Sequence, residues 1–211
     1  MIEVALIGNP NSGKTSLFNL MTGHNQRVGN WPGVTVERKS GLVKKHKDIE
    51  IQDLPGIYSM SPYSPEEKVA RDYLLSKKAD SILNVVDATN LERNLYLTTQ
   101  LIETGIPVTL ALNMSDVLEA QGKTINIDKL SYHLGVPVVA TSALKQTGVD
   151  KVVKKAAHTT IASVGDIAFP IYDDKLEAAI SQILDVLGNS VPQRSARFYA
   201  IKLFEHDALV E

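Results

Sequence analysis

The feature that most constrains this chain is the run Gly-Asn-Pro-Asn-Ser-Gly-Lys-Thr at residues 8–15. It fits the phosphate-binding pattern G-x-x-x-x-G-K-[ST] and lies between an apolar run at residues 2–7 and a helical pattern over residues 14–21. A strand, glycine-rich loop and helix in this order surround a phosphate with backbone N–H groups and the positive end of a helix dipole. The sequence therefore predicts an α/β P-loop NTPase, in which Lys14 would reach the β- and γ-phosphates. Nucleotide contacts are expected from Gly8, Asn9, Pro10, Asn11, Ser12, Gly13, Lys14, Thr15 and Ser16.

The order of apolar and helical patterns predicts a doubly wound, mostly parallel sheet of about six strands with crossover helices. Residues 35–44 and 48–53 instead predict an antiparallel hairpin at one edge of that sheet. Residues 24–35 are rich in glycine, asparagine and proline, which predicts a mobile loop rather than a helix or strand. The expected strands are residues 2–7, 35–44, 48–53, 81–87, 108–113 and 136–140.

Composition excludes several kinds of site. The 211-residue chain contains no cysteine and has a formal net charge of -2, so disulfides and thiolate metal sites are excluded and nucleic-acid binding is not expected. Its five histidines show no paired metal-ligand spacing, so we expect no iron site. No apolar run is long enough to span a membrane, and the chain is expected to be soluble as given.

The last quarter of the chain differs from the rest. Composition changes near residues 163–166, and only two helical patterns follow, at residues 175–187 and 195–206. Two short amphipathic helices bury little apolar surface by themselves. We therefore predict a nucleotide-binding domain at residues 1–165 and a short helical segment at residues 166–211, which we expect to be an incomplete domain of a larger protein.

The sequence Asn-Met-Ser-Asp at residues 113–116 follows a predicted strand and indicates guanine as the base. The Asp116 carboxylate would accept hydrogen bonds from guanine N1–H and the 2-amino group, whereas adenine would present an acceptor there. Asn113 would join this loop to the P-loop, and the Ala143 N–H would donate to guanine O6. The residues expected around the base are Asn113, Met114, Asp116, Ser142, Ala143 and Leu144.

Two further segments predict a Mg²⁺ site and a nucleotide-sensitive loop. Asp53 begins the sequence Asp-Leu-Pro-Gly, in which its carboxylate would hold Mg²⁺ through water and the Gly56 N–H would bond the γ-phosphate. Thr15 would supply one hydroxyl ligand of Mg²⁺, and Thr35 would supply the second only with a triphosphate bound. The alternative for Thr35 is a plain strand-starting residue. The contacts expected from this loop are Gly33, Val34 and Thr35.

Together these motifs resemble the N-terminal G domain of FeoB, the prokaryotic ferrous iron transporter family. The resemblance covers roughly residues 1–165 and implies a Ras-like G domain, and the later residues resemble the start of the family's helical spacer domain. It implies a GTPase at the cytoplasmic face of the prokaryotic membrane that regulates or gates iron transport by a membrane domain of the same polypeptide. The matching stretches are residues 8–15, 30–35 (Asn-Trp-Pro-Gly-Val-Thr), 53–58 (Asp-Leu-Pro-Gly-Ile-Tyr), 84–89 (Asn-Val-Val-Asp-Ala-Thr) and 113–116.

Two departures from the wider GTPase pattern change what is expected of the site. Met114 replaces the lysine of N-K-x-D, which keeps an apolar stem over the base but removes a cation, so we expect weaker nucleotide binding and faster release. Ile57 stands where Ras-like proteins carry a water-orienting glutamine, and its side chain cannot position water.

The resemblance to potassium-activated GTPases, FeoB included, implies that K⁺ compensates for this loss. Asn11 and backbone carbonyls of residues 29–31, with Gly29 and Trp31 among them, would hold K⁺ against the β- and γ-phosphates, as an arginine finger does elsewhere. The alternatives are that Asn11 merely caps the loop and that Arg27 or Arg38 supplies the positive charge. The Trp31 ring either covers the nucleotide or packs on the following proline.

Two other functions share these core motifs. A ribosome- or RNA-associated assembly GTPase would need a basic or KH-type RNA-binding segment, and this sequence contains none. A non-catalytic, nucleotide-gated interaction module would bind the nucleotide without cleaving it. The expected cofactors are GTP or GDP, Mg²⁺ and K⁺, and the expected partners are the membrane domain and, as a further possibility, a second copy of the chain.

Overall fold

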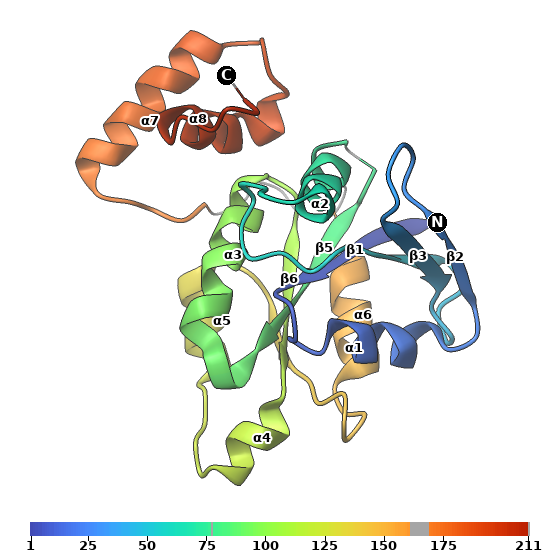
Figure 1. Cartoon of the computed structure of the whole chain (residues 1–211). Helices are drawn as coiled ribbons and strands as arrows, with labels where there is room; N and C mark the ends of the chain where they lie inside the picture. Colours follow the sequence, from blue (N-terminus) through green and yellow to red (C-terminus); the bar gives the residue numbers. More distant parts are fainter. Residues whose placement is uncertain (77, 161–168, 211) are drawn as a thin grey trace.

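The computed structural model describes residues 1–76, 78–160 and 169–210. Its centre is a seven-stranded sheet with the order β2-β3-β4-β1-β5-β6-β7 (Figure 1). Neighbouring strands from β4 to β7 are parallel, whereas β3 pairs antiparallel with both β2 and β4, so the predicted mostly parallel α/β sheet is confirmed. The strands are β1 (Ile2–Gly8), β2 (Gln26–Asn30), β3 (Glu37–Leu42), β4 (Ile49–Asp53), β5 (Ser81–Asp87), β6 (Val108–Asn113) and β7 (Val138–Ala140).

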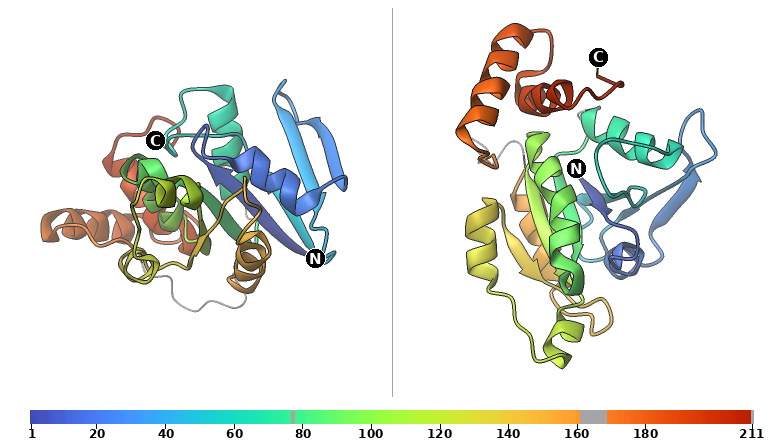
Figure 2. Two further views of the ribbon diagram at one scale, coloured as in Figure 1. Left: turned by 90° about the horizontal axis from the view of Figure 1, so that it is seen from below. Right: turned by 60° about the vertical axis from the view of Figure 1, so that its left-hand side comes forward.

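Helices cover both faces of the sheet, as the two other views show (Figure 2). Along β1, Val4 and Leu6 pack with α1 and α6, whereas Ala5 and Ile7 pack with α2 and α3, and all four side chains are fully buried. An unbroken apolar run is what a strand covered on both faces requires. The helices of these two layers are α1 (Lys14–Thr22), α6 (Val149–His158), α2 (Pro65–Leu75), α3 (Leu91–Glu103) and α5 (Ile127–Leu134). Along the chain, the short η1 (Ala88–Asn90) precedes α3 and the short α4 (Ser115–Ala120) precedes α5.

The strand register gathers the predicted site residues at the carboxyl ends of the parallel strands. Asp53 lies opposite Leu6 of β1, and Asn113 lies opposite Asp87 of β5. Both residues end their strands, and the P-loop begins where β1 ends. The carboxyl ends of parallel strands are where open α/β sheets bind ligands, so these separate sequence motifs meet at the expected ligand site, which we call the crevice.

The prediction of a mobile loop at residues 24–35 is wrong for its central part. Residues 26–30 form β2, which pairs antiparallel with β3 from Gln26 opposite Gly41 to Asn30 opposite Glu37. Most of β2 is exposed, so the partner edge of β3 and not burial holds a segment of weak strand propensity in place. The sheet therefore has a seventh strand, and β2 forms the edge that the predicted hairpin of β3 and β4 was expected to form.

The C-terminal segment consists of α7 (Asp174–Leu187), η2 (Gln193–Ser195) and α8 (Ala196–Phe204). Ile180 of α7 packs with Ala200 and Ile201 of α8, while the fully buried Phe198 of α8 enters the core cluster beside α2 and α3. The short helical segment predicted from the sequence is confirmed, and its predicted boundary at residue 165 lies outside the described residues. None of the described helices is both long and apolar enough to cross a membrane.

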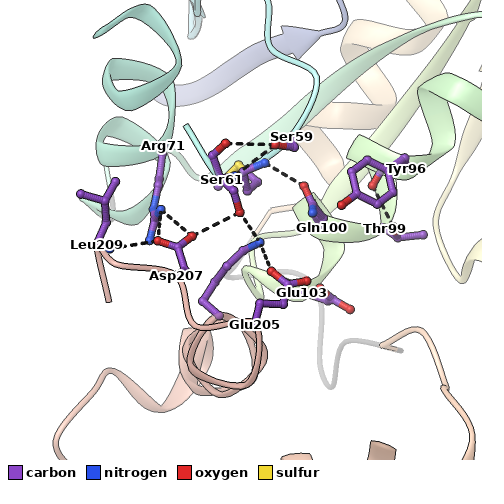
Figure 3. Close-up of polar contacts among 12 residues, drawn as sticks. Ser59, Ser61, Arg71, Tyr96, Thr99, Gln100, Glu103, Glu205, Asp207 and Leu209 are labelled. Carbon is purple, nitrogen blue, oxygen red and sulfur yellow. Dashed lines mark hydrogen bonds and ion pairs between the residues drawn. The ribbon is translucent and has the colours of Figure 1, made fainter. Parts of the chain in front are cut away.

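A buried polar junction joins this segment to the rest of the fold (Figure 3). Arg71 of α2 donates to both carboxylate oxygens of Asp207 at 3.0 and 3.1 Å, and Ser61 Oγ donates to the same carboxylate at 3.2 Å. Lys202 Nζ, fully buried, donates to Ser61 Oγ at 2.9 Å. The junction thus contacts residues that closely follow the Asp-Leu-Pro-Gly motif.

Burial of the Asp207 carboxyl would raise its pKa, but the Leu209 N–H, Arg71 and Ser61 together hold that pKa below its usual value. A carboxylate whose folded-state pKa is depressed stabilises the fold above its unfolded pKa, and that contribution is lost as pH falls through the folded pKa. The junction therefore weakens in acid.

Candidate functional site

The P-loop between β1 and α1 has the shape of an anion cradle. Asn11 and Gly13 have φ of 66° and 86°, and a Cβ added at Gly13 would lie 2.2 Å from the Asn113 side-chain nitrogen, so only glycine fits there. No side chain caps α1, and its first turn contains no acidic residue. The N–H groups of that turn have no intrahelical acceptors and are left for a bound anion.

Lys14 and Asp53 form an ion pair in the middle of the crevice, with Nζ and Oδ1 2.5 Å apart and both side chains about nine-tenths buried. Burial raises the pKa of Asp53, and the charge of Lys14 opposes that rise. A cationic and an anionic side chain that meet at the P-loop are suited to receive a phosphate and a divalent metal ion, respectively.

Asn113 joins three segments of the site. Its Nδ2 donates to the Ser12 carbonyl at 2.9 Å, while its Oδ1 accepts from the Ala143 N–H at 3.1 Å and from the Thr141 hydroxyl at 3.4 Å. The side chain is 1% exposed, so the P-loop and both predicted base-binding loops are fixed to one buried amide. In this structure the Ala143 N–H that was expected to face guanine O6 points to Asn113.

The predicted base-specificity loop begins α4. Met114 has a φ of 61° and forms the N-cap of that helix, and its terminal methyl lies beside Gly13 of the P-loop. Asp116 lies in the first turn with only 9% of its surface exposed. Ser115 donates from its hydroxyl to the Thr141 carbonyl at 2.9 Å, which holds the two loops together. Leu144, beyond them, is exposed.

The Asp-Leu-Pro-Gly segment lies directly against the P-loop. The Ile57 N–H donates to the Gly8 carbonyl at 3.2 Å, and a Cβ added at Gly56 would lie 3.3 Å from the Pro10 nitrogen. The Ile57 side chain is fully buried in the core. The Ile57 side chain therefore offers no polar group to a nucleotide at the P-loop.

Thr35 lies in a different place from the other predicted ligands. Residues 31–36 close the hairpin of β2 and β3, with the Trp31 N–H donating to the Val36 carbonyl at 2.9 Å, and this hairpin projects from the edge of the sheet (Figure 2). Thr35 is exposed there, and Gly29 pairs with Arg38 within β2 and β3. Among the described residues, no hydrogen bond joins this turn to the P-loop.

Trp31 neither covers the crevice nor rests mainly on the following proline. Its ring is 8% exposed and meets Tyr73 of α2 edge to face, with ring centroids 5.3 Å apart, while the Arg38 guanidinium lies 5.0 Å from its centroid. Ile57 and Met60 belong to the same core cluster. The loop that carries Thr35 is thus anchored on α2 by a buried tryptophan.

Sequence reasoning missed a contact between α3 and the crevice. Arg93 lies over the ring of Tyr58 at 4.6 Å, and its carbonyl accepts from Asn9 Nδ2 at 3.5 Å. The side-chain oxygens of Asn9 and Ser12 are buried in the P-loop and have no hydrogen-bond partner among the residues that the structure describes. No local pattern marks Arg93, because its partners lie in segments far away along the chain.

Comparison with known proteins identifies the family of the chain. A family model described as ferrous iron transport protein B matches residues 2–156, and a model of the FeoB cytosolic helical domain matches residues 172–211. The chain belongs to the FeoB family. An Fe(2+) transport protein A/Fe(2+) transporter FeoB fusion protein of Porphyromonas gingivalis is 47% identical over 98% of this chain. The match spans about a quarter of that relative's length (25%).

Solved structures of FeoB N-terminal regions resemble this chain throughout. An S. thermophilus NFeoB N11A mutant bound to mGDP is 89% identical, with a TM-score of 0.99, over 100% of this chain and 81% of that one. S. thermophilus NFeoB bound to GDP.AlF4- and K+ is 90% identical, with a TM-score of 0.93, over 100% of this chain and 82% of that one. The G-domain fold predicted from the sequence is confirmed by this likeness.

Proposed function

We propose that this chain is the GTP-binding and GTP-hydrolysing module of a FeoB transporter, and that it regulates or gates ferrous iron passage through a membrane domain of the same polypeptide at its cytoplasmic face. The observation that carries the proposal is the crevice in which Asn113 ties the P-loop to the base loops, beside the Lys14 and Asp53 pair. The S. thermophilus relatives bound to GDP, mGDP and GDP.AlF4- support it.

In this proposal, different residues of the chain bind the phosphates and the base of the nucleotide. Lys14 and the N–H groups of the P-loop and first turn of α1 hold the phosphates, and the Gly56 N–H contacts the γ-phosphate. Asp116 selects guanine, and Met114 covers the base. The partly buried Ala143 and the exposed Leu144 complete the base pocket, once the Ala143 N–H is shared between Asn113 and O6.

The crevice suits Mg²⁺ by the chemistry of its donors. Thr15 is exposed at the start of α1 and Asp53 ends β4, so a hydroxyl and a carboxylate flank the place where phosphates would lie. Such hard oxygen ligands are what Mg²⁺ prefers beside nucleotide phosphates. Bound there, the metal would neutralise charge on the phosphates, and Lys14 would exchange its contact with Asp53 for one with phosphate oxygens.

The P-loop also offers an oxygen ligand for K⁺. Asn11 is exposed in the left-handed conformation at the mouth of the crevice, and the S. thermophilus relative bound to GDP.AlF4- and K+ supports a monovalent site in this family. The carbonyls of Gly29 and Trp31 belong to the β2–β3 hairpin in this structure. They would serve as K⁺ ligands only after that hairpin rearranges.

Single-turnover phosphate release tests the function. With Mg²⁺ and K⁺ present, the chain is expected to cleave GTP and to leave ATP intact, and Lys14→Ala should lower the rate at least about 100-fold by removing charge from the transition state. Circular dichroism would confirm that the variant is folded. Cleavage of neither nucleotide, in K⁺ or in Na⁺, would show instead a non-catalytic module that binds GTP.

A second prediction concerns Thr35 and uses Trp31, the one tryptophan of the chain. For Thr35 to reach Mg²⁺, the loop must leave α2, so Trp31 emission should move to longer wavelength with Mg²⁺ and the triphosphate analogue GMPPNP but not with GDP. Exposing the Trp31 ring gives up favourable burial of apolar surface, which the new Thr35 contact has to offset in part.

Thr35→Ala should therefore abolish this emission change while leaving GDP affinity nearly unaltered. Tyr63→Ala, an exposed residue outside this loop, is the matched control and should keep the change. Identical spectra in the two nucleotides, or a shift that persists in Thr35→Ala, would show that Thr35 is structural.

A further inference from the structure

We propose that the face built by α1, α6 and the turn between β3 and β4 docks on an anionic membrane surface. The proposal rests on the proposed function in one respect, because the membrane domain would hold this chain beside a bilayer. Two segments about a hundred residues apart in the sequence each contribute exposed lysines to this basic face. They are Lys44, Lys45 and Lys47 in the turn and Lys151 and Lys154 on α6.

Contacts within the fold hold the two segments together. His46 of the turn contacts the Asp150 carboxylate at the start of α6, with Nε2 and Oδ1 3.1 Å apart, and Lys154 Nζ lies 2.8 Å from the other oxygen of the same carboxylate. Asp150 of α6 is thus occupied on both sides, and Asp48 is the acidic residue of the turn. The lysines outnumber these two aspartates, so the face is positively charged.

A cavity of about 250 Å³ lies between α1, α6 and the turn. Its floor is apolar, with Met21, Val43 and Val153 buried beneath it, and Lys44 and Lys45 stand at its rim. Lysine stems lie on such apolar surfaces while their ammonium groups reach outward. Cations around a shallow apolar hollow match the lipid interface, where phosphates lie just above glycerol and the first methylene groups.

The charge is distributed so that this face favours an anionic surface. The whole chain has a formal net charge of -2, so the remainder of the molecule is more acidic than the whole. Such an asymmetry orients a protein as it approaches a charged plane. The helical segment enters the opposite layer through Phe198, and the turn precedes β4 at the edge of the sheet away from the P-loop. Docking through this face would leave the polar junction free.

The expected strength of membrane binding suits a domain that is tethered to the membrane by the rest of its polypeptide. Each lysine near an anionic leaflet raises the membrane partition coefficient about fivefold at moderate salt, so a few lysines give weak binding to a free domain. The same contact becomes substantial when a membrane domain of the same polypeptide supplies a high effective concentration. The isolated chain should therefore bind reversibly and with strong salt dependence.

Co-sedimentation with vesicles tests the inference on this chain directly. We expect binding to vesicles of equal parts phosphatidylglycerol and phosphatidylcholine, none to phosphatidylcholine alone, and release in high salt. Replacing Lys44, Lys45 and Lys47 together by Gln should lower the partition coefficient about 100-fold. The matched control replaces Lys123, Lys129 and Lys175, exposed lysines of other elements, and should bind like the wild type after allowance for the common change in net charge.

Four results would overturn the proposal. Three of them are equal binding to neutral and anionic vesicles, equal loss in the two triple variants, and release by millimolar glycerol phosphate, which would indicate a small-anion pocket in the cavity. Tighter binding to a polyglutamate peptide than to vesicles would assign the face to an acidic protein instead. GDP affinity and GTP cleavage of each variant are measured in parallel, so a failed proposed function is seen separately from a failed membrane contact.

Discussion

Asp116→Asn is expected to lower GTP affinity by about 10²- to 10⁴-fold, because two hydrogen bonds to a carboxylate are lost and an amide donor would face guanine donors in a closed pocket. The structure gives the reason for a large effect: Asp116 is nine-tenths buried in the first turn of α4, so water cannot replace the carboxylate easily. Xanthosine triphosphate, which presents a 2-oxo acceptor, should gain affinity in the same variant.

Isothermal titration with GTP, XTP and ATP measures this exchange of preference. Asp128→Asn makes the same chemical change in the first turn of α5, at an exposed site, and should leave all three affinities unaltered. Unchanged GTP affinity in Asp116→Asn would remove Asp116 from the base pocket. Equal loss of GTP and XTP binding would indicate instead that the buried carboxylate is needed for the fold of α4.

The sequence predicts those parts of the site where the backbone conformation or close packing allows only a few residue types. Gly13 is an example, since its positive φ and the close approach of Asn113 both exclude a side chain. Buried parallel strands also have unbroken apolar runs that are visible in the sequence. Together these features were sufficient to place the P-loop, Asp53 and Asn113 at one edge of the sheet.

What could not be predicted depends on contacts between distant segments. β2 exists because β3 offers a free edge, and this tertiary pairing overrides the weak strand propensity of Gly29 and Asn30. Trp31 is buried because Tyr73 of α2 receives it, and Arg71 meets Asp207 across 136 residues. No local pattern encodes such partners. The loop prediction failed because composition alone cannot show what edge a segment will meet.

K⁺ is expected to accelerate GTP hydrolysis through Asn11, and the structure narrows the alternatives. Ile57 is fully buried in the core and offers no polar group. Arg38 donates to Gln52 at 3.0 Å and covers Trp31, and Arg27 lies on the edge strand β2, opposite Ser40 of β3. Asn11, by contrast, is exposed in the P-loop itself. A cation bound by the Asn11 amide oxygen is therefore the best available source of positive charge.

A cation in the position of an arginine finger raises the hydrolysis rate by about 10³- to 10⁵-fold, so single-turnover rates in K⁺ should exceed those in Na⁺ by a large part of that factor. Asn11→Ala should remove most of the difference. It should leave Mg²⁺-GTP binding largely intact, because Lys14, Thr15 and the backbone cradle remain, and the S. thermophilus N11A relative is itself bound to mGDP. Asn189→Ala, at an exposed asparagine far from the crevice, is the control. Equal wild-type rates in the two salts would exclude K⁺ as a cofactor. If K⁺ still stimulates Asn11→Ala with an unchanged concentration dependence, the K⁺ site lies elsewhere.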